Sequence, residues 1–342
     1  MNITVDFEVA EKIIDLINEK KYIDDATYED EMSKIEKLEG MQKMLNYYKG
    51  SFDFSTYKEL LFKALNNFEY VSEDESLNAV YTYLKKVIED TERLNNKLRL
   101  MRDYDFNKFE KKLVEKLPKN TNVDVDIFFA FDALNGGTII NDKTMMLNTM
   151  FWPSKEENLK LIEGILLHEY HHIGFFYWMR KFDRDFDKYS DANGMVRYLI
   201  ISILGEGAAT YFYNDGDDMY PLVLESHGEA LAESTRSAMG NRGNNVAEYI
   251  RDLEKDIRYI MSSEDDIKEL KSFVNKYFYS SNGEPLDKSI GYHMCETIDQ
   301  ELGLEKLIEC FEKPNIFLNR YNHASGKNSE FKVAEDIVEF FQ

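Results

Sequence analysis

The sequence has 342 residues, with 64 acidic and 42 basic side chains and a net charge of −22. A chain of this length can fold as one large domain or as two smaller ones. The strong negative charge argues against nucleic-acid partners, which are bound through Lys and Arg, and against anionic membrane surfaces. The only two cysteines, Cys295 and Cys310, predict no disulfide framework and fit a reducing compartment.

The sequence also carries no signal for export or membrane insertion. Its start, MNITVDFEVAEKII, lacks a basic segment followed by an uninterrupted apolar run, as a secretory signal would have. The longest apolar run, near Tyr198 to Leu204, is too short to span a bilayer. We therefore expect a cytoplasmic protein without a membrane partner. Its oligomeric state stays open.

The first third of the chain predicts helices. The chain has five prolines, and long Lys- and Glu-rich stretches follow helical spacing, which is typical of a mainly α protein. The aromatic residues in this region also follow that spacing, and no basic stripe accompanies them, so they are interpreted as packing residues. The clearest predicted helices before Pro118 cover residues 12–20, 28–48, 55–70, 75–95 and 103–117.

After Pro118 the pattern changes to short strands. Residues 123–129 begin as an alternating strand, and residues 138–141 and 144–149 predict two more. From about residue 215 the chain is helical again. The predicted fold class is therefore mainly α with a small β-sheet (α+β). We expect three regions: a helical region at 1–118, a core with strands at 119–215, and a second helical region at 216–342 that completes a cleft.

The chemistry is carried by a motif that follows these strands. His168-Glu169-Tyr170-His171-His172 reads H-E-x-x-H, on a helix predicted to begin at the capping box Ser154 to Glu157 and to end near Phe182. Positions i and i+4 share one helix face, so His168 and His172 can bind one ion. Glu169 lies about 100° round the helix, near a water on that ion. The pattern predicts a hydrolytic Zn²⁺ site with Glu169 as general base.

A third protein ligand is needed, because catalytic zinc usually has three such ligands and a water. Residues 196–213 predict an almost wholly apolar helix whose only acid is Glu206. A lone carboxylate there is costly to bury unless it is paired or binds metal, so Glu206 is the predicted third ligand. Small residues around it would let this helix approach the zinc helix. The alternatives are a salt bridge from Glu206 to Arg197, and Glu225 or Glu229 as the ligand.

These residues resemble the gluzincin metallopeptidases, which bind zinc through H-E-x-x-H and a downstream glutamate. Gly205-Glu206-Gly207-Ala208-Ala209 also resembles the G-E-G-x-A segment of a family of zinc-dependent peptidases whose substrates are unassigned. The resemblance covers about residues 123–213, with a weaker echo near Gly291. It implies a zincin-like catalytic core, a peptide or protein substrate, and a strand edge that holds extended substrate. The long spacing from His172 to Glu206 leaves room for an inserted loop at about 181–194.

The expected reaction is hydrolysis of a peptide bond. Zinc would polarise the carbonyl and lower the pKa of its bound water towards about 7. Glu169 would take a proton from that water and pass it to the leaving amine. The oxyanion needs a donor, and the resemblance implies a tyrosine or histidine of a C-terminal helix. Tyr292 and His293 are the candidates, and His293 is the catalytic residue predicted beside Glu169.

Other interpretations remain beside this one. Asp185, Asp187 or Asp191 could accept a hydrogen bond from a ligand histidine, or could simply be solvated charges. The two histidines could be core residues satisfied by hydrogen bonds. A di-iron carboxylate protein would need a second Glu-x-x-His, which the sequence lacks. The main alternative function is a non-catalytic metal- or peptide-binding protein on a peptidase-like scaffold, although retention of Glu169 favours catalysis.

Overall fold

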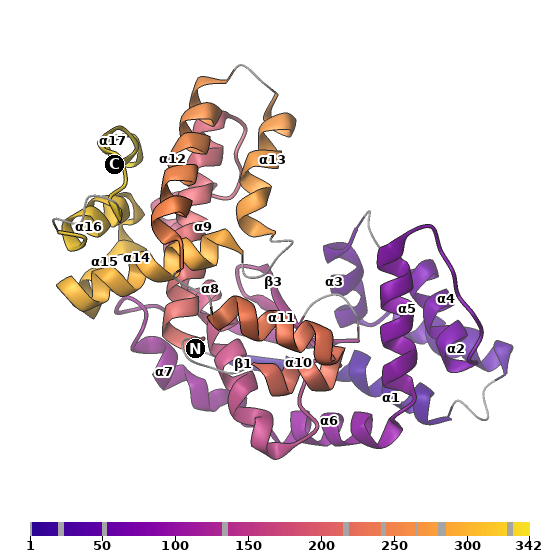
Figure 1. The fold of residues 1–342 in the computed structure, drawn as a ribbon. Helices are drawn as coiled ribbons and strands as arrows, with labels where there is room; N and C mark the ends of the chain where they lie inside the picture. The colour runs from indigo at the N-terminus through magenta and orange to yellow at the C-terminus, as the bar shows by residue number, and fades with distance from the viewer. Residues whose placement is uncertain are drawn as a thin grey trace. The chain divides into compact units, whose positions relative to one another are not determined.

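The computed structural model describes residues 2–19, 24–49, 53–131, 136–214, 219–240, 244–263, 266–279, 285–326 and 331–342. These residues form helices and one four-stranded mixed sheet, so the predicted α+β class is confirmed (Figure 1). No helix among them is long and apolar enough to cross a membrane. The chain divides into two compact units, and each takes up several stretches of the sequence.

The first unit contains Met1–Lys108, Asp124–Glu163 and Pro221–Glu229. Its helices are joined by short connections, and most of the predicted helices are present with shifted ends. Its elements are β1 (Ile3–Asp6), α1 (Glu8–Glu19), α2 (Asp25–Glu36), α3 (Glu39–Tyr47), α4 (Phe54–Leu65), α5 (Glu75–Ile88), α6 (Thr91–Asp103), the 3-10 turn at Phe106–Phe109, β2 (Val125–Ala130), β3 (Gly137–Asn141), β4 (Thr144–Asn148), the 3-10 turn at Glu156–Asn158 and most of α10 (Tyr220–His227).

The sheet has the strand order β1-β2-β4-β3. β2 pairs in parallel with both β1 and β4, and β3 is antiparallel to β4. α1 and α3 pack against β2. The rings of Phe129 and Trp152 lie 5.3 Å apart between their centroids and, with Phe7 and Phe106, form an aromatic core beside the sheet. β1 was not predicted, because its partner in the sheet lies more than a hundred residues away in the sequence.

Two long predicted helices are broken in the structure. The predicted helix at 28–48 is α2 followed by α3, and the predicted helix at 75–95 is α5 followed by α6. In the second case Asp90 accepts a hydrogen bond from the amide of Arg93, which caps a new helix. The capping box at Ser154 is also wrong: the long helix α8 (Leu159–Phe182) begins later, because the Ser154 amide donates instead to Glu225.

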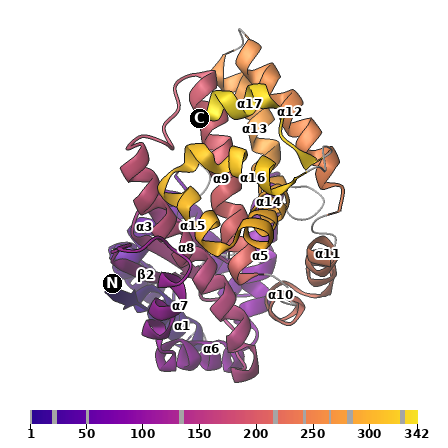
Figure 2. The same cartoon turned by 90° about the vertical axis from the view of Figure 1, so that its left-hand side faces the viewer.

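The second unit contains Phe109–Val123, Gly164–Tyr220 and Ala230–Gln342. Figures 1 and 2 show α9, α12, α13 and α14 of this unit lying side by side. The division into regions at 1–118, 119–215 and 216–342 that the sequence predicted stays a prediction. Besides α8, the elements of this unit are α7 (Glu110–Val114), α9 (Ala192–Tyr213), α11 (Glu229–Gly240), α12 (Val246–Ser262), α13 (Ile267–Phe278), α14 (Leu286–Leu302), α15 (Leu304–Glu312), the 3-10 turn at Pro314–Ile316, α16 (Phe317–Ala324) and α17 (Glu335–Phe341).

Candidate metal centre

Two helices of the second unit bring the predicted metal ligands together. His168 and His172 lie one turn apart on α8, and their Nε2 atoms are 3.1 Å apart. Glu206 projects from α9, with one carboxylate oxygen 3.4 Å from Nε2 of His168 and the other 3.3 Å from Nε2 of His172. The three side chains therefore point their donor atoms at one another.

The donor atoms lie close enough together to share one ion. Ligand atoms about 2.0–2.2 Å from zinc at tetrahedral angles lie roughly 3.3–3.6 Å from one another. Both histidines are buried, with 5% and 6% of their surface exposed, and the three donor atoms lie within 4.8 Å of one another. In the described part of the chain, Nδ1 of His168 has no hydrogen-bond partner. Two imidazoles and one carboxylate form a donor set that could hold Zn²⁺.

Glycines allow the helices to approach closely enough for this arrangement. A Cβ on Gly205 would lie 2.8 Å from the ring of Phe175 on α8, so this glycine faces α8 as expected. Gly207 faces α14 instead. A Cβ there would lie 2.1 Å from the carbonyl carbon of Gly291, so α9 and α14 touch backbone to backbone. Glu206, between the two glycines, is therefore held between α8 and α14.

The close approach of α14 brings a lysine to the site. Nζ of Lys288 lies 3.3 Å from Oε2 of Glu206. Burial alone would raise the pKa of Glu206, but Lys288 and the two histidines outweigh it and hold that pKa well below its usual range. Burial lowers the pKa of Lys288, but Glu206, Asp287 and Glu169 outweigh it, so the net shift is upward. Both groups are therefore charged at neutral pH. Sequence analysis did not single out Lys288.

Glu169 is half-buried beside this group. The negative charge of Glu169 raises the pKa of both His172 on α8 and Lys288 on α14. The pKa values of His168 and His172 are shifted in opposite directions. Burial lowers the pKa of His168, whereas at His172 the same effect is outweighed by Glu206 and Glu169, and the pKa is raised. A neutral imidazole is the form that binds metal, and burial favours that form at His168.

The sequence model of a family described as "Putative zinc dependent peptidase (DUF5700)" matches residues 32–330. The chain belongs to this family. The matched span contains His168, Glu169, His172, Glu206 and Lys288. No curated protein and no solved structure matches the chain.

The two predicted oxyanion donors of this DUF5700 protein, Tyr292 and His293, contact aromatic side chains, and their catalytic role stays a prediction. The ring of His293 lies 5.0 Å from that of Phe331 and 6.0 Å from that of Tyr321. His293 is also about 140° round α14 from Lys288. The ring of Tyr292 packs on Tyr211, 5.6 Å away, and its hydroxyl lies 3.5 Å from Glu296.

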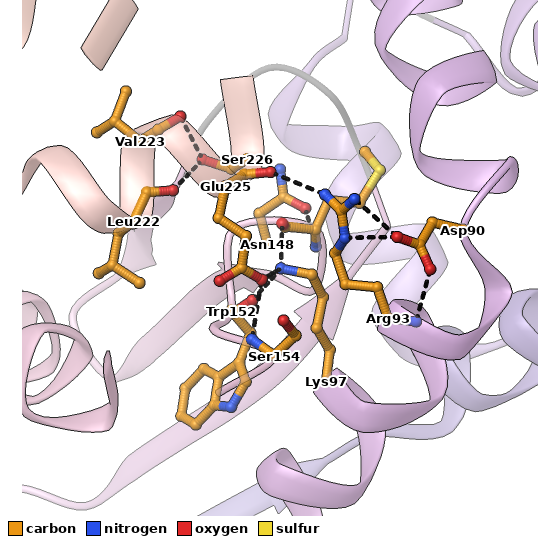
Figure 3. Close-up of polar contacts among 11 residues, drawn as sticks. Asp90, Arg93, Lys97, Asn148, Trp152, Ser154, Leu222, Val223, Glu225 and Ser226 are labelled. Carbon is orange, nitrogen blue, oxygen red and sulfur yellow. Dashed lines mark hydrogen bonds and ion pairs between the residues drawn. The ribbon is translucent and has the colours of Figure 1, made fainter. Parts of the chain in front are cut away.

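The residues named in the alternative interpretations of Glu206 are Arg197, Glu225 and Glu229, and each has a different environment. The guanidinium of Arg197 lies over the ring of Phe340, at 5.6 Å from its centroid. Glu229 is exposed. Glu225 belongs to the first unit, where its carboxylate lies 2.9 Å from Nζ of the buried Lys97 (Figure 3).

The nearby aspartates and the remaining motif histidine have structural roles. Asp185 pairs with Lys188, Asp187 pairs with Arg180, and Asp191 caps α9 through the amide of Gly194. His171 is fully buried against the rings of Phe212 and Phe311, and burial holds its pKa well below the usual value. His171 is therefore a core residue, whereas the core interpretation of His168 and His172 stays an alternative to metal binding.

Proposed function

We propose that this protein is a gluzincin-type zinc peptidase. In this proposal His168, His172 and Glu206 hold Zn²⁺, and Glu169 is the general base. The observation that carries it is the cluster of two buried histidines and the Glu206 carboxylate, whose donor atoms lie within 4.8 Å of one another beside a half-buried glutamate. Membership of the zinc-peptidase family supports the same conclusion. The proposed substrate is a peptide or protein.

In this proposal the residues of the site have different roles in the reaction. When bound, zinc supplies a Lewis acid that polarises the scissile carbonyl and lowers the pKa of water towards about 7. The Glu169 carboxylate takes a proton from the attacking water and gives it to the leaving amine nitrogen. His168 and His172 orient the site from one rigid helix turn, and Glu206 completes it from α9.

Lys288 supplies positive charge where the reaction develops negative charge. Its ammonium already lies beside Glu206, at 3.3 Å, and it is the cation closest in sequence to the predicted donors on α14. A fixed cation in a partly buried site stabilises an oxyanion more strongly than it would in water. We propose Lys288 as this donor. The role predicted for His293 stays a prediction. Mutation of each residue can distinguish the role of His293 from that of Lys288.

Metal content per chain is the first test. Elemental analysis of purified wild-type protein should give about one zinc, and Glu206→Ala should lose most of it, because two protein ligands hold zinc weakly. Glu169→Gln should keep the zinc and lose hydrolysis, because the base does not bind the ion. Zinc absent from the wild-type protein even after reloading would overturn the proposal. Full hydrolysis by Glu169→Gln would overturn the role of the base.

A further inference from the structure

A cavity of about 170 Å³ opens beside the metal ligands, within the second unit. His172 and Glu206 form part of its wall, so whatever fills the cavity lies next to the proposed reaction centre. The rest of the lining is mostly aromatic and aliphatic. It comes from Phe175, Phe176, Phe186, Tyr198 and Ile201.

The lining offers no uncompensated charge to a ligand. Among the described residues of the wall, Asp187 is the only carboxylate besides Glu206, and two of its contacts with the Arg180 guanidinium measure 2.6 and 2.5 Å. The Arg180 guanidinium also lies 4.7 Å from the centroid of the Phe186 ring. Glu206 is balanced by Lys288. A charged side chain entering this cavity would lose its hydration and find no free counter-charge.

The size of the cavity limits its occupant to one side chain. A cavity of about 150 Å³ lined by Leu, Ile and Phe is large enough to bind benzene. This one is of similar size and has similar lining, so it can hold one benzyl, isobutyl or thioether side chain. Gly205 lets the Phe175 ring pack directly against the backbone of α9 in this wall, because a Cβ at that position would lie 2.8 Å from the ring.

We infer that this cavity is the specificity pocket of the peptidase, and that it takes one uncharged apolar side chain, such as Phe, Leu or Met, from a residue flanking the scissile bond. This inference rests on the proposed function, because it uses the position of the metal ligands. It adds a substrate class: peptides with an apolar residue beside the cleaved bond, in preference to peptides with Asp, Glu, Lys or Arg there.

The pocket can be tested by binding as well as by turnover. Zinc-loaded protein would be titrated with small hydroxamates that differ only in one group: methyl, isobutyl, benzyl, carboxyethyl or aminobutyl. We expect the isobutyl and benzyl compounds to bind at least about tenfold more tightly than the methyl compound, since added apolar carbons in a fitted pocket give such factors. The two charged compounds should gain nothing. Cleavage sites mapped in a mixed peptide library should show the same order.

Variants locate the effect in this cavity. Phe186→Ala removes one wall and should shift the preference towards a larger group such as naphthylmethyl, and Phe186→Leu is the milder variant if the first fails to fold. Phe182→Ala is the matched control, because Phe182 is 45% exposed and does not line the cavity. Equal affinity for every hydroxamate in zinc-loaded protein would overturn the pocket alone. Protein that binds neither zinc nor the methyl compound would overturn the proposed function and the pocket with it.

Discussion

At the scale of single residues, Glu206 is the centre of the site's electrostatics. Its carboxylate lies within 3.4 Å of both histidines and of Lys288, so three groups share one anion. A metal ion would compete with the ammonium for the charge on this carboxylate. Lys288 should therefore stabilise the metal-free protein and at the same time weaken the binding of a dication beside it.

Lys288→Met should consequently bind zinc more tightly than wild type. A unit charge pair 4 Å apart is worth about 4 kcal/mol at an effective dielectric of 20, and removing this repulsion should raise zinc affinity about tenfold or more. The melting temperature of the metal-free variant should fall, because Glu206 loses its cation. Chelator competition and thermal melts with and without zinc measure both effects. The exposed Lys268→Met is the control for net charge, and weaker zinc binding by Lys288→Met would contradict the argument.

Hydrolysis should distinguish Lys288 from His293. Loss of one oxyanion donor lowers kcat by about 10²- to 10³-fold in well-studied hydrolases. We expect Lys288→Met to lose activity on that scale, because the ammonium that would stabilise the oxyanion is removed. The variant should keep its zinc, because the Lys288 ammonium lies beside the ligand Glu206 and does not itself bind the ion. His293→Gln should lose less, since its ring packs against Phe331. Steady-state kinetics of the two variants at matched zinc content decide between them, and a larger loss in His293→Gln would support His293 as the donor instead of Lys288.

At the scale of elements, the contact between α9 and α14 positions the lysine. A Cβ on Gly291 would lie 2.0 Å from the carbonyl oxygen of Ile203 and 2.7 Å from Cα of Gly207. These are backbone atoms, so the contact cannot be relieved by a side chain turning away. The spacing of the two helices is thus fixed by two glycines, one on each helix.

Gly291→Ala should therefore force the helices apart. Alanine favours a helix over glycine by about 1 kcal/mol, but overpacking of this kind costs about 1–3 kcal/mol or more, so the net change should be destabilising. Urea unfolding should give a lower midpoint for this variant. Gln300→Ala, on an exposed position of the same helix, should change stability by less than about 0.5 kcal/mol. An unchanged midpoint for Gly291→Ala would show that the helices can separate at little cost.

The local parts of the site could be predicted from sequence, and the non-local parts could not. The i, i+4 spacing of His168 and His172 is a property of one helix, so it is visible in the motif. Glu206 stood out because it is the only acid in an apolar helix. No local sequence pattern distinguished Lys288 from the other lysines of the chain. Lys288 reaches the site through a glycine contact between helices more than eighty residues apart, and only the packed structure reveals that contact.

The fold shows the same division between local and distant information. The predicted strands at 123–129, 138–141 and 144–149 are β2, β3 and β4, and their ends differ from the predicted ones by at most two residues. β1 has only four residues, and its partner Val125 is distant in the sequence, so no local pattern marks it. Helix breaks at Leu38 and Asp90 were missed because helical spacing continues across both positions.

At the scale of the whole molecule, the chain passes between its two units several times. Pro221–Glu229 belongs to the first unit, although the residues before and after it belong to the second. A buried polar cluster holds this returning segment (Figure 3): Nζ of Lys97 donates to the carbonyls of Met150 and Trp152 and to Glu225. Glu225 also accepts from the amide of Ser154, so α6, α10 and the segment before α8 meet at one carboxylate.

Glu225→Gln should destabilise the protein in a pH-dependent way. Burial raises the pKa of Glu225, but Lys97 and Ser154 outweigh it, so the folded-state pKa lies below its ordinary value of 4.5. The stabilisation from the ionised group is thus fully present above that value and is lost as the pH falls through the lower, folded-state pKa. At pH 7 the variant leaves Lys97 buried beside a neutral amide, and we expect a loss of about 3 kcal/mol.

The difference between wild type and Glu225→Gln should therefore shrink as the solution is acidified. Urea unfolding followed at pH 7, 5, 4 and 3 measures this difference directly, because the variant has no carboxyl group to protonate at position 225. Glu229→Gln is the matched control: Glu229 follows closely in the chain and is exposed, so its difference from wild type should stay small throughout. A difference that stays constant from pH 7 to pH 3 would show that the charge of Glu225 contributes nothing, and that the carboxyl acts only through hydrogen bonds that glutamine can also make.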